Sequence, residues 1–416
     1  MNSALPSSFQ SVHESSTSRV AGWRLGIPVY IYAVIFSSFC VVLGLLWDIM
    51  WHMSIGRDGL LAPPHVVIYI GAIVSGLFSA YQILKLTLTK NDPGRAQAVP
   101  FWGVFYGPLG AMFSVWGALA MLTSAPFDDW WHNTYGLDVQ ILTPPHTVLA
   151  IGIMTVQFGA LVGVLALQNQ LRYQTVTPDS HSNGRASRLK WLFALSAGFL
   201  LMMLYTLLSE SMGKHESHYS GYYATAAIIF PFYLLAVGRA SLLRWPITII
   251  SSIYMIGMLV PSWVLQNFPA TPRLGPVSND ITHYQPFMFP LLLVIPALAI
   301  DWLMQRFDAP KDGKRKLNDW LLAGLYAVVF MLILLAVQWP FGEFLVTSPY
   351  ARNGVFLSYS MGYDGSPDWE FRYAFPPWLT QSTPVFLKNY GKALLYATLS
   401  ARVGLYWGNW MKRVAR

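Results

Sequence analysis

Apolar residues in this chain gather in ten stretches of about twenty residues each, separated by shorter polar segments. A helix needs roughly 20 apolar residues to cross the hydrocarbon core of a bilayer, and helices satisfy their own backbone polar groups there. Only 11% of the residues are charged, against about 25% in soluble domains. The sequence therefore predicts an all-α polytopic membrane protein with about ten transmembrane helices. The predicted spans are residues 27–51, 65–86, 101–123, 146–168, 191–208, 222–242, 246–265, 285–304, 318–339 and 391–410.

Basic residues are distributed unevenly among the segments that join these spans. If the N-terminus lies inside, the inner segments and the inner ends of the adjoining spans hold 19 Lys and Arg residues and the outer segments hold 6. Basic loops tend to stay in the cytoplasm, so we expect both termini to be cytoplasmic in an inner (plasma) membrane. The same loops account for the net charge of +8, and the expected partner of this chain is the lipid bilayer, with no nucleic acid.

The chain divides into two predicted membrane units. Residues 1–26 are a cytoplasmic tail and residues 27–170 a four-helix unit. A cytoplasmic linker, 171–190, leads to a six-helix unit, 191–416, in which residues 340–390 are rich in Pro and aromatic residues and predict an outer cap.

Histidines are concentrated on the expected outer side. Seven of the nine fall at outer helix ends or in outer loops, and histidine is a common metal ligand that is rarely idle in a membrane. The outer histidines are His52, His65, His132, His146, His215, His218 and His283.

The four-helix unit contains an internal repeat. Residues 48–71 and 128–152 align when one residue is inserted in the second copy. Each copy ends one predicted helix, crosses a short outer loop and begins the next helix. The aligned positions are Asp48/Asp128, Trp51/Trp131, His52/His132, Gly56/Gly136, Asp58/Asp138, Pro63-Pro64-His65/Pro144-Pro145-His146 and Gly71/Gly152.

Each copy has the residue types and the spacing of a metal site. Asp48 and His52 are four residues apart and so share one helix face. His65 begins the next helix after two prolines that stiffen its entry, so a short hairpin can return it to the first two. Two imidazoles and one carboxylate with open positions suit copper, non-haem iron or zinc. The second copy repeats the set as Asp128, His132 and His146.

Three loop residues are candidates for supporting roles. Asp58 and Asp138 are expected to hold a ligand imidazole in one tautomer, and Arg57 to pair with either acid. The competing interpretation is two ordinary helix ends, with histidines bonded to backbone groups, acids as polar stops and tryptophans as interfacial anchors. Because the same ligand types recur at nearly the same spacing, we favour metal sites.

The first copy resembles the C subunit of the copper membrane monooxygenases, which are the particulate methane and ammonia monooxygenases. That subunit carries an Asp-x3-His-x12-His motif written around Trp-His, Arg-Asp and Pro-x-His. Asp48, His52 and His65 match it position for position. The accompanying residues are Trp51, Arg57, Asp58 and Pro63.

The second copy resembles the other cluster of that family, Asn-x3-His-x13-His. Asp128, His132 and His146 match its spacing, with Asp128 standing where the family has Asn. The resemblance ends near residue 170. It implies copper at the first cluster, a metal at the second, O2 activation, hydroxylation of a small apolar substrate, electrons from a quinol, and partner subunits in a three-subunit complex.

The second unit holds one further group of ligand types. Glu210, His215 and His218 lie together in the outer segment after the fifth predicted helix, and the two histidines are three residues apart. A third metal site or an entry port is one interpretation, and a solvated loop is the other.

Three functions remain open from the sequence. The first is a copper-dependent membrane monooxygenase or its metal-binding subunit, with Asp48, His52 and His65 as the first choice of catalytic ligands. The second is a non-catalytic copper protein for delivery or storage. The third is a structural subunit that retains the motif for stability.

Overall fold

The computed structural model describes residues 26–56, 59–136, 142–173, 180–273, 281–308, 317–358 and 381–415. The chain is 78% helical, which confirms the all-α class. Within the described ranges the α-helices are α1 (Val29–Ser54), α2 (Pro63–Leu88), α3 (Leu109–Tyr135), α4 (Pro144–Tyr173), α5 (Ser180–Leu208), α6 (Ser220–Ala240), α7 (Pro246–Leu265), α8 (Val294–Leu303), α9 (Asp319–Thr347) and α10 (Thr383–Met411). The shorter elements are η2 (Pro93–Gln97), β1 (Val99–Phe101), β2 (Phe105–Gly107), η3 (Ser209–Ser211), η4 (Lys214–Glu216), the π-turn η5 (Met304–Asp308) and η6 (Pro349–Ala351).

Eight of the ten helices are long and apolar enough to cross a membrane. The other two are α8, which has only 10 residues, and α10, which has 29 residues but a more polar composition. Lys388, Lys392 and Arg402 lie within α10. The outward face of α2 is apolar, since Leu77 and Tyr81 are 65% and 66% exposed, as expected of a surface that faces lipid.

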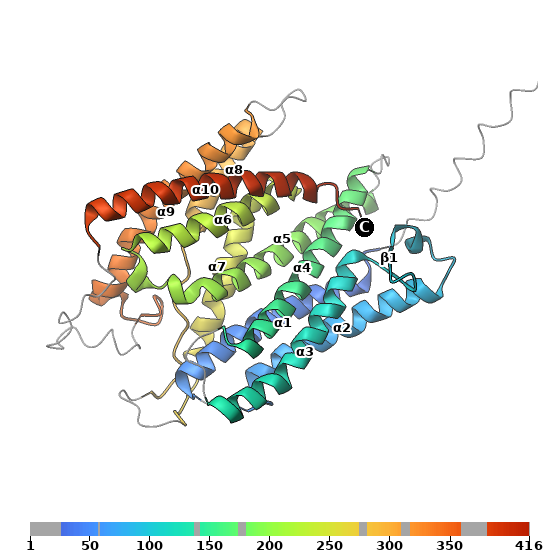
Figure 1. Ribbon diagram of the computed structural model, residues 1–416, viewed down its shortest axis with the longest axis horizontal. Coiled ribbons are helices and arrows are strands. Elements are labelled where there is room, and N and C mark those ends of the chain that lie inside the picture. Colours follow the sequence, from blue (N-terminus) through green and yellow to red (C-terminus); the bar gives the residue numbers. More distant parts are fainter. Residues whose placement is uncertain are drawn as a thin grey trace, which may run out of the picture.

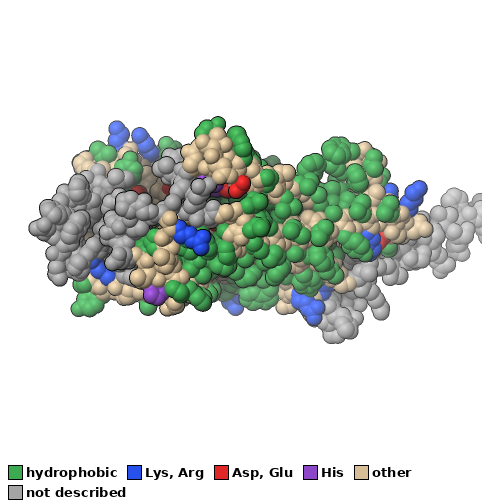
Figure 2. Space-filling model, turned by 90° about the horizontal axis from the view of Figure 1, so that it is seen from below, with side chains coloured by type: hydrophobic (Ala, Val, Ile, Leu, Met, Phe, Trp, Pro, Cys, Tyr) green, Lys and Arg blue, Asp and Glu red, His purple; other side chains and the backbone are tan. Residues whose placement is uncertain are grey.

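The helices pack side by side in one bundle (Figure 1). α1 to α4 form one side, with α1 packed on α2 and α3 packed on α4. α5 and α7 contact α1 and lie between these hairpins and the pair formed by α6 and α10. Figure 2 shows hydrophobic side chains over most of the middle of the bundle. The fold therefore presents a broad apolar belt, and its helix termini gather at two opposite ends.

The third predicted span, 101–123, begins and ends earlier in the chain than the helix that the structure shows, α3 (Leu109–Tyr135). Residues 99–107 form the antiparallel hairpin β1–β2, and α3 then begins at Leu109. Tyr106 N–H donates to Thr87 Oγ1 at 2.9 Å, which ties the hairpin to the end of α2. α3 continues to Tyr135 through Pro126, because a transmembrane helix tolerates an internal proline.

The eighth predicted span, 285–304, is helical only in its second part. Residues 284–293 have no regular secondary structure before α8 begins at Val294. Pro286 and Pro290 lack backbone N–H groups and disfavour helix in the residues before them. Side chains of neighbouring helices accept from two N–H groups that have no helical partner: Leu291 N–H donates to Tyr254 OH at 3.0 Å and Leu292 N–H to Gln338 Oε1 at 3.2 Å. Non-helical backbone is tolerated at this depth because protein surrounds it.

Two segments that the sequence predicted between membrane spans, the linker and the cap, are partly helical in the structure. α4 continues to Tyr173 and α5 starts at Ser180, inside the predicted linker 171–190, and residues 174–179 lie outside the described ranges. α9 reaches Thr347, so the start of the predicted cap 340–390 is helical. Residues 359–380 of that cap lie outside the description.

A buried arginine joins four elements at the end of the bundle where α6 and α10 terminate. The Arg239 guanidinium donates to both carboxylate oxygens of Asp308, at 2.8 and 2.9 Å, and to Asp319 Oδ1 at 3.1 Å. It also donates to the Leu405 carbonyl at 3.3 Å. The Arg239 side chain is 1% exposed. This network therefore ties α6 to η5, α9 and α10.

Candidate metal centres

The two copies of the repeat form two helical hairpins of the same design. α1 and α3 each end beside a glycine with positive φ, Gly56 at 90° and Gly136 at 89°, a conformation that only glycine adopts readily. α2 and α4 then begin at the first proline of each Pro-Pro-His sequence, Pro63 and Pro144. Proline suits the first turn of a helix, where its missing N–H is not needed. The sequence thus places His65 and His146 one turn into their helices.

In both hairpins, the backbones of the two helices approach each other closely at equivalent glycine residues. A Cβ atom on Gly71 of α2 would lie 3.0 Å from the Ser37 carbonyl oxygen and 2.6 Å from Val41. A Cβ atom on Gly152 of α4 would lie 2.9 Å from the Gly117 carbonyl oxygen. Positions 37 and 117, like 48 and 128, differ by 80, so the repeat extends into the helix packing. Close approach of the backbones at glycine is typical of helix pairs in membranes.

Gly71→Ala is expected to destabilise the protein by about 1–3 kcal/mol, because the added methyl group overfills a contact whose far side is backbone. It is also expected to separate α1 from α2 and so to weaken metal retention at His65. Thermal unfolding in detergent and metal content after dialysis measure both effects. The matched control is Gly324→Ala in α9, where a Cβ atom meets nothing within 4 Å and where Ala favours the helix. Equal behaviour of the two variants would show that the close contact is unimportant.

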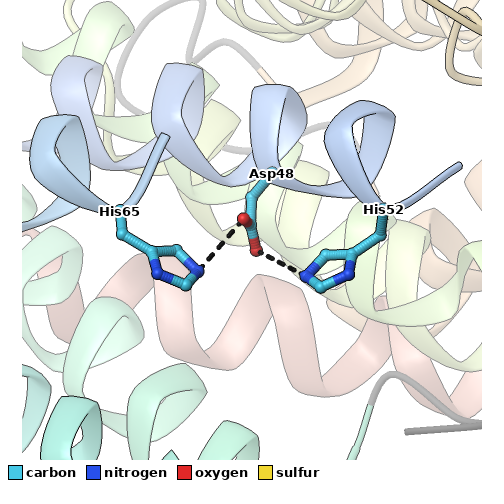
Figure 3. Close-up of side chains that lie close together, drawn as sticks. All are labelled: Asp48, His52 and His65. Carbon is cyan, nitrogen blue, oxygen red and sulfur yellow. Dashed lines mark ion pairs between the residues drawn. The ribbon is translucent and has the colours of Figure 1, made fainter. Parts of the chain in front are cut away.

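The first cluster brings Asp48, His52 and His65 together across the α1–α2 hairpin (Figure 3). His65 Nε2 lies 3.2 Å from Asp48 Oδ1, and His52 Nε2 lies 3.8 Å from Asp48 Oδ2. One ligand atom from each residue lies within 4.8 Å of the others. Both rings point Nε2 toward the carboxylate, so three donor atoms converge on one volume.

The second cluster repeats this arrangement across the α3–α4 hairpin. His132 Nε2 and His146 Nε2 lie 3.5 and 3.3 Å from Asp128 Oδ1. The two imidazole ring centroids are 6.1 Å apart. One donor atom from each residue again lies within 4.8 Å of the others. The spacing argument from the sequence therefore holds for the geometry of both copies.

Backbone carbonyl groups determine which ring nitrogen faces each aspartate. His65 Nδ1 lies 3.1 Å from the Gly59 carbonyl oxygen, and His132 Nδ1 lies 3.0 Å from the Gly136 carbonyl oxygen. A carbonyl can only accept, so Nδ1 carries the proton in both rings, and Nε2 of a neutral imidazole then presents a lone pair. That lone pair is directed at a carboxylate oxygen.

Two acceptors that face each other at this distance repel unless a cation lies between them. Asp48 Oδ1 and Asp128 Oδ1 are buried atoms that accept no hydrogen bond from any residue that the structure describes. A proton on Nε2 or a bound metal ion removes this repulsion, and two imidazole nitrogens beside one carboxylate form a donor set that could hold a metal ion. Holding the proton on Nδ1 through a carbonyl is the usual way in which proteins orient a ligand imidazole.

A small cavity joins the two clusters. Its volume is about 20 Å³, and it lies between α2 and α3 with His65 on one side and Asp128 and His132 on the other. This is close to the room that one water molecule needs. Leu60 and Tyr69 complete much of the wall. Both clusters can therefore share a bound molecule of that size.

The second membrane unit holds the end of α1 in place just beyond His52. Gln285 N–H donates to Ser54 Oγ at 2.8 Å, and Arg273 N–H donates to the Ile55 carbonyl at 2.8 Å. Trp47 Nε1–H donates to Tyr284 OH at 3.4 Å. α3, which carries the second cluster, lies at the outer edge of the bundle (Figure 1). The first cluster is thus braced by non-helical segments from the second half of the chain, between α7 and α8.

Ser54→Ala is expected to cost about 1–3 kcal/mol, because it leaves the buried Gln285 N–H without an acceptor. We also expect weaker metal binding at the first cluster and unchanged binding at the second. Ser38→Ala is the matched control, since both serines are buried in α1 and donate to a carbonyl four residues earlier. Chemical unfolding and metal titration of the two variants provide the comparison, and indistinguishable curves would contradict the bracing role.

Sequence reasoning did not find the supporting residues Trp47, Ser54, Tyr69 and Tyr284. Tyr69 follows His65 by four residues, so its place beside that ring was readable from helical spacing, and their ring centroids are 6.1 Å apart. Tyr284 reaches α1 from 237 residues away. A single sequence carries no signal for that contact.

The other candidates have different outcomes. Arg57, Asp58 and Asp138 lie outside the described residues. Among the residues that are described, the Asp-His-His clusters are the groups that bring three ligand atoms together, and Glu210, His215 and His218 do not form a third.

His218 and His283 make contacts of another kind. The His218 ring stacks on Trp339 with centroids 4.0 Å apart, and its Nε2 lies 3.2 Å from the Trp339 carbonyl oxygen. His283 lies in an isolated bridge with Pro269. Both histidines therefore have structural contacts with neighbouring backbone.

Comparison of the chain with protein-family models, with curated proteins and with solved structures found no match. The resemblance to the copper monooxygenase subunit accordingly rests on the two motifs and their spacing.

Proposed function

We propose that this protein is a copper-dependent membrane monooxygenase or the metal-binding subunit of one. The observation that carries the proposal is the convergence of two imidazole Nε2 atoms on one carboxylate, twice, with a backbone carbonyl fixing the proton on Nδ1. This donor set suits a metal ion and leaves coordination positions open for O2 or substrate.

Copper is the metal we favour. Imidazole suits copper, iron and zinc, and copper(II) stands highest among the divalent first-row metals in general affinity. The motif resemblance points the same way. Non-haem iron and zinc are the alternatives, because iron also uses two histidines and a carboxylate with open positions.

The residues of the chain would have separate roles at the first cluster. Asp48 supplies the negative charge, and His52 and His65 supply neutral donors. The Gly59 carbonyl keeps the His65 proton on Nδ1 and so keeps Nε2 available. The adjoining cavity has room for one molecule the size of water. A bound copper ion would supply the one-electron chemistry that O2 activation requires, and a quinol would supply the electrons.

The proposal includes an orientation in the membrane. The clusters face outward from an inner (plasma) membrane, and the opposite end of the bundle, with Arg239, Arg244, Arg306 and Lys412, faces the cytoplasm. The positive-inside rule supports this orientation. The exposed apolar faces of α2 and α3 leave room for partner subunits beside lipid.

Oxygen incorporation tests the proposed reaction. The copper-loaded full chain in lipid nanodiscs receives a quinol, 18O2 and a series of small apolar substrates, alone and with the membrane fraction that supplies partner subunits. We expect 18O-labelled alcohol from the unaltered protein and from His215→Ala, and at least about a 100-fold loss with His52→Ala. Bound copper without labelled product under both conditions would contradict the monooxygenase proposal.

Copper delivery or storage is the second candidate. The exposed fraction of the ligand side chains favours it, since His52 and His146 are 32% and 24% exposed and a partner could reach them. This function predicts rapid transfer of copper to a competing chelator with no turnover. Copper that resists the chelator while supporting oxidation would exclude delivery.

A further inference from the structure

A cavity of about 260 Å³ lies at the end of the bundle opposite the two metal clusters. It is partly open, and it is formed where α6 and α10 end, where α7 begins, and where α8 passes into the π-turn η5. π-turns are rare and are often found at functional sites. The polar lining residues are Arg239, Arg244, Asp301, Gln305, Asp308 and Lys412.

The acidic residues of this cavity are already satisfied by the protein. Asp301 accepts three hydrogen bonds, from two backbone N–H groups in the first turn of α7 and from the Thr248 hydroxyl, at 2.7 to 3.2 Å. Asp308 pairs through both oxygens with Arg239. The charge of Asp308 is thus balanced by Arg239, whereas the oxygens of Asp301 are occupied by uncharged donors of the protein.

Besides Arg239, the cavity is lined by two basic residues, Arg244 and Lys412. Arg244 is an exposed residue in the turn between α6 and α7. Its Nε donates to Gln305 Oε1 at 3.3 Å, and Gln305 Nε2 donates to the Arg244 carbonyl at 3.1 Å. These two reciprocal hydrogen bonds orient the Arg244 guanidinium through its Nε atom. They do not involve its terminal Nη1 and Nη2 atoms. Lys412, at the end of α10, lines the same cavity.

The surroundings indicate the depth of the cavity in the bilayer. Trp302, Trp320 and Trp410 are 55%, 58% and 47% exposed near the same helix ends, and tryptophan gathers at the headgroup level of membranes. Leu243, Pro246 and Met304 contribute an apolar part of the lining. A ligand that fits this cavity must combine an anionic group with an apolar portion.

We propose that this cavity binds the phosphate headgroup of an anionic phospholipid in the cytoplasmic leaflet. Arg244 and Lys412 contact the phosphate, and the apolar lining receives the glycerol backbone. Basic pockets between transmembrane helices on the cytoplasmic side commonly bind such headgroups. The volume is below the roughly 300–1,000 Å³ of pockets that enclose whole drug-sized ligands, so the acyl chains lie outside along the bundle.

The bound lipid would stabilise the packing of the helices that surround the cavity. Residues of α6, α7, α8, η5 and α10 surround the cavity. Arg239 joins α6 to η5 and α10, and Asp301 joins α8 to the start of α7. Filling it adds contacts between the rest of the bundle and α10, the one long helix among those described that lacks a stretch apolar enough to qualify as a membrane span. Loss of the lipid is expected to loosen α10 first.

Native mass spectrometry of the detergent-purified full chain tests the proposal. Phosphatidylglycerol, phosphatidylcholine, glycerol phosphate and inorganic phosphate are added separately, and thermal unfolding is followed in parallel. We expect one retained phosphatidylglycerol per chain with a rise in unfolding temperature, and no comparable effect of the other three. The Arg244→Gln/Lys412→Gln variant should bind about fivefold more weakly for each lost charge, roughly 25-fold in all.

The matched control is Arg306→Gln, because Arg306 is an exposed cation on η5 that does not line the cavity. It should retain the lipid, and Arg244→Lys should recover most of the binding that Arg244→Gln loses. Equal retention of phosphatidylglycerol and phosphatidylcholine by the unaltered protein would overturn the proposal. So would stabilisation by inorganic phosphate alone, or equal loss in the Arg306→Gln control. If the double variant fails to fold, the comparison of lipids on the unaltered protein decides.

Discussion

Replacing Asp48 with Ala is expected to empty the first cluster of metal and to leave the second cluster loaded. Asp48 is the one carboxylate among the three ligands, and its two oxygens face His65 and His52. Removing even a supporting partner of a metal ligand costs about 10–100-fold in affinity, so loss of the ligand itself should cost more than about 100-fold. Copper content should fall by one equivalent per chain, measured by atomic spectroscopy after dialysis against a weak chelator.

The reciprocal variant and a matched control make this result specific. Asp128→Ala should empty the second cluster alone. Asp129→Ala should leave both clusters loaded, because the Asp129 carboxylate accepts from Asn133 and belongs to neither cluster. Simultaneous loss of both metals from each single variant would mean that the two clusters bind as one unit. Full copper content in Asp48→Ala would remove Asp48 from the ligand set.

Arg239→Met should lower the free energy of unfolding by about 3–5 kcal/mol, because breaking a buried ion pair leaves an uncompensated buried charge. The Arg239 and Asp308 side chains are 1% and 9% exposed, and Asp319 would lose the same partner. Chemical unfolding in detergent measures the change. Methionine keeps most of the side-chain volume, so the loss reports on charge and hydrogen bonding.

Two further variants test the cause of that loss. Arg239→Met/Asp308→Leu should be less destabilised than Arg239→Met alone, since it removes one of the stranded carboxylates. Arg306→Met, at an exposed cation on η5, should change stability by no more than about 0.5 kcal/mol. A loss in Arg306→Met as large as that in Arg239→Met would attribute the effect to general charge at this end.

The sequence was sufficient to predict both clusters because their geometry is local. Four-residue spacing places Asp48 beside His52 on any helix, and the Pro-Pro start of the following helix places His65 opposite them. The short loop between the two helices leaves few other arrangements. The same reasoning applied to Asp128 and His146, and the repeat made the inference stronger than either copy alone.

Hydropathy located most helices but placed two spans wrongly. In the span 285–304, Pro286 and Pro290 disfavour helix in the residues before them and α8 begins only at Val294, yet these residues are as apolar as those of a helical span. Hydropathy measures the tendency of a residue to leave water, and a buried non-helical segment satisfies it equally well. In the span 101–123, the apolar residues of the β1–β2 hairpin read as the start of a helix.

The contacts that distinguish the two clusters were beyond reach of the sequence alone. Gln285 meets Ser54 across 231 residues, and Tyr284 reaches Trp47 from the second membrane unit. No local pattern encodes such pairs. They give the first cluster a brace on its helix end, while the second cluster lies on the hairpin at the edge of the bundle. We therefore expect tighter and slower-exchanging metal at the first cluster.

Metal content combined with electron paramagnetic resonance is the most direct test of the central claim, that the two Asp-His-His clusters bind copper. The purified full chain, loaded with copper and dialysed, is compared with His52→Ala/His132→Ala and with His215→Ala. We predict about two copper ions per chain and a type-2 copper(II) signal in the unaltered protein and in His215→Ala, and the loss of both in the double variant. Absence of stoichiometric metal after copper loading, or an unchanged signal in the double variant, would contradict the account.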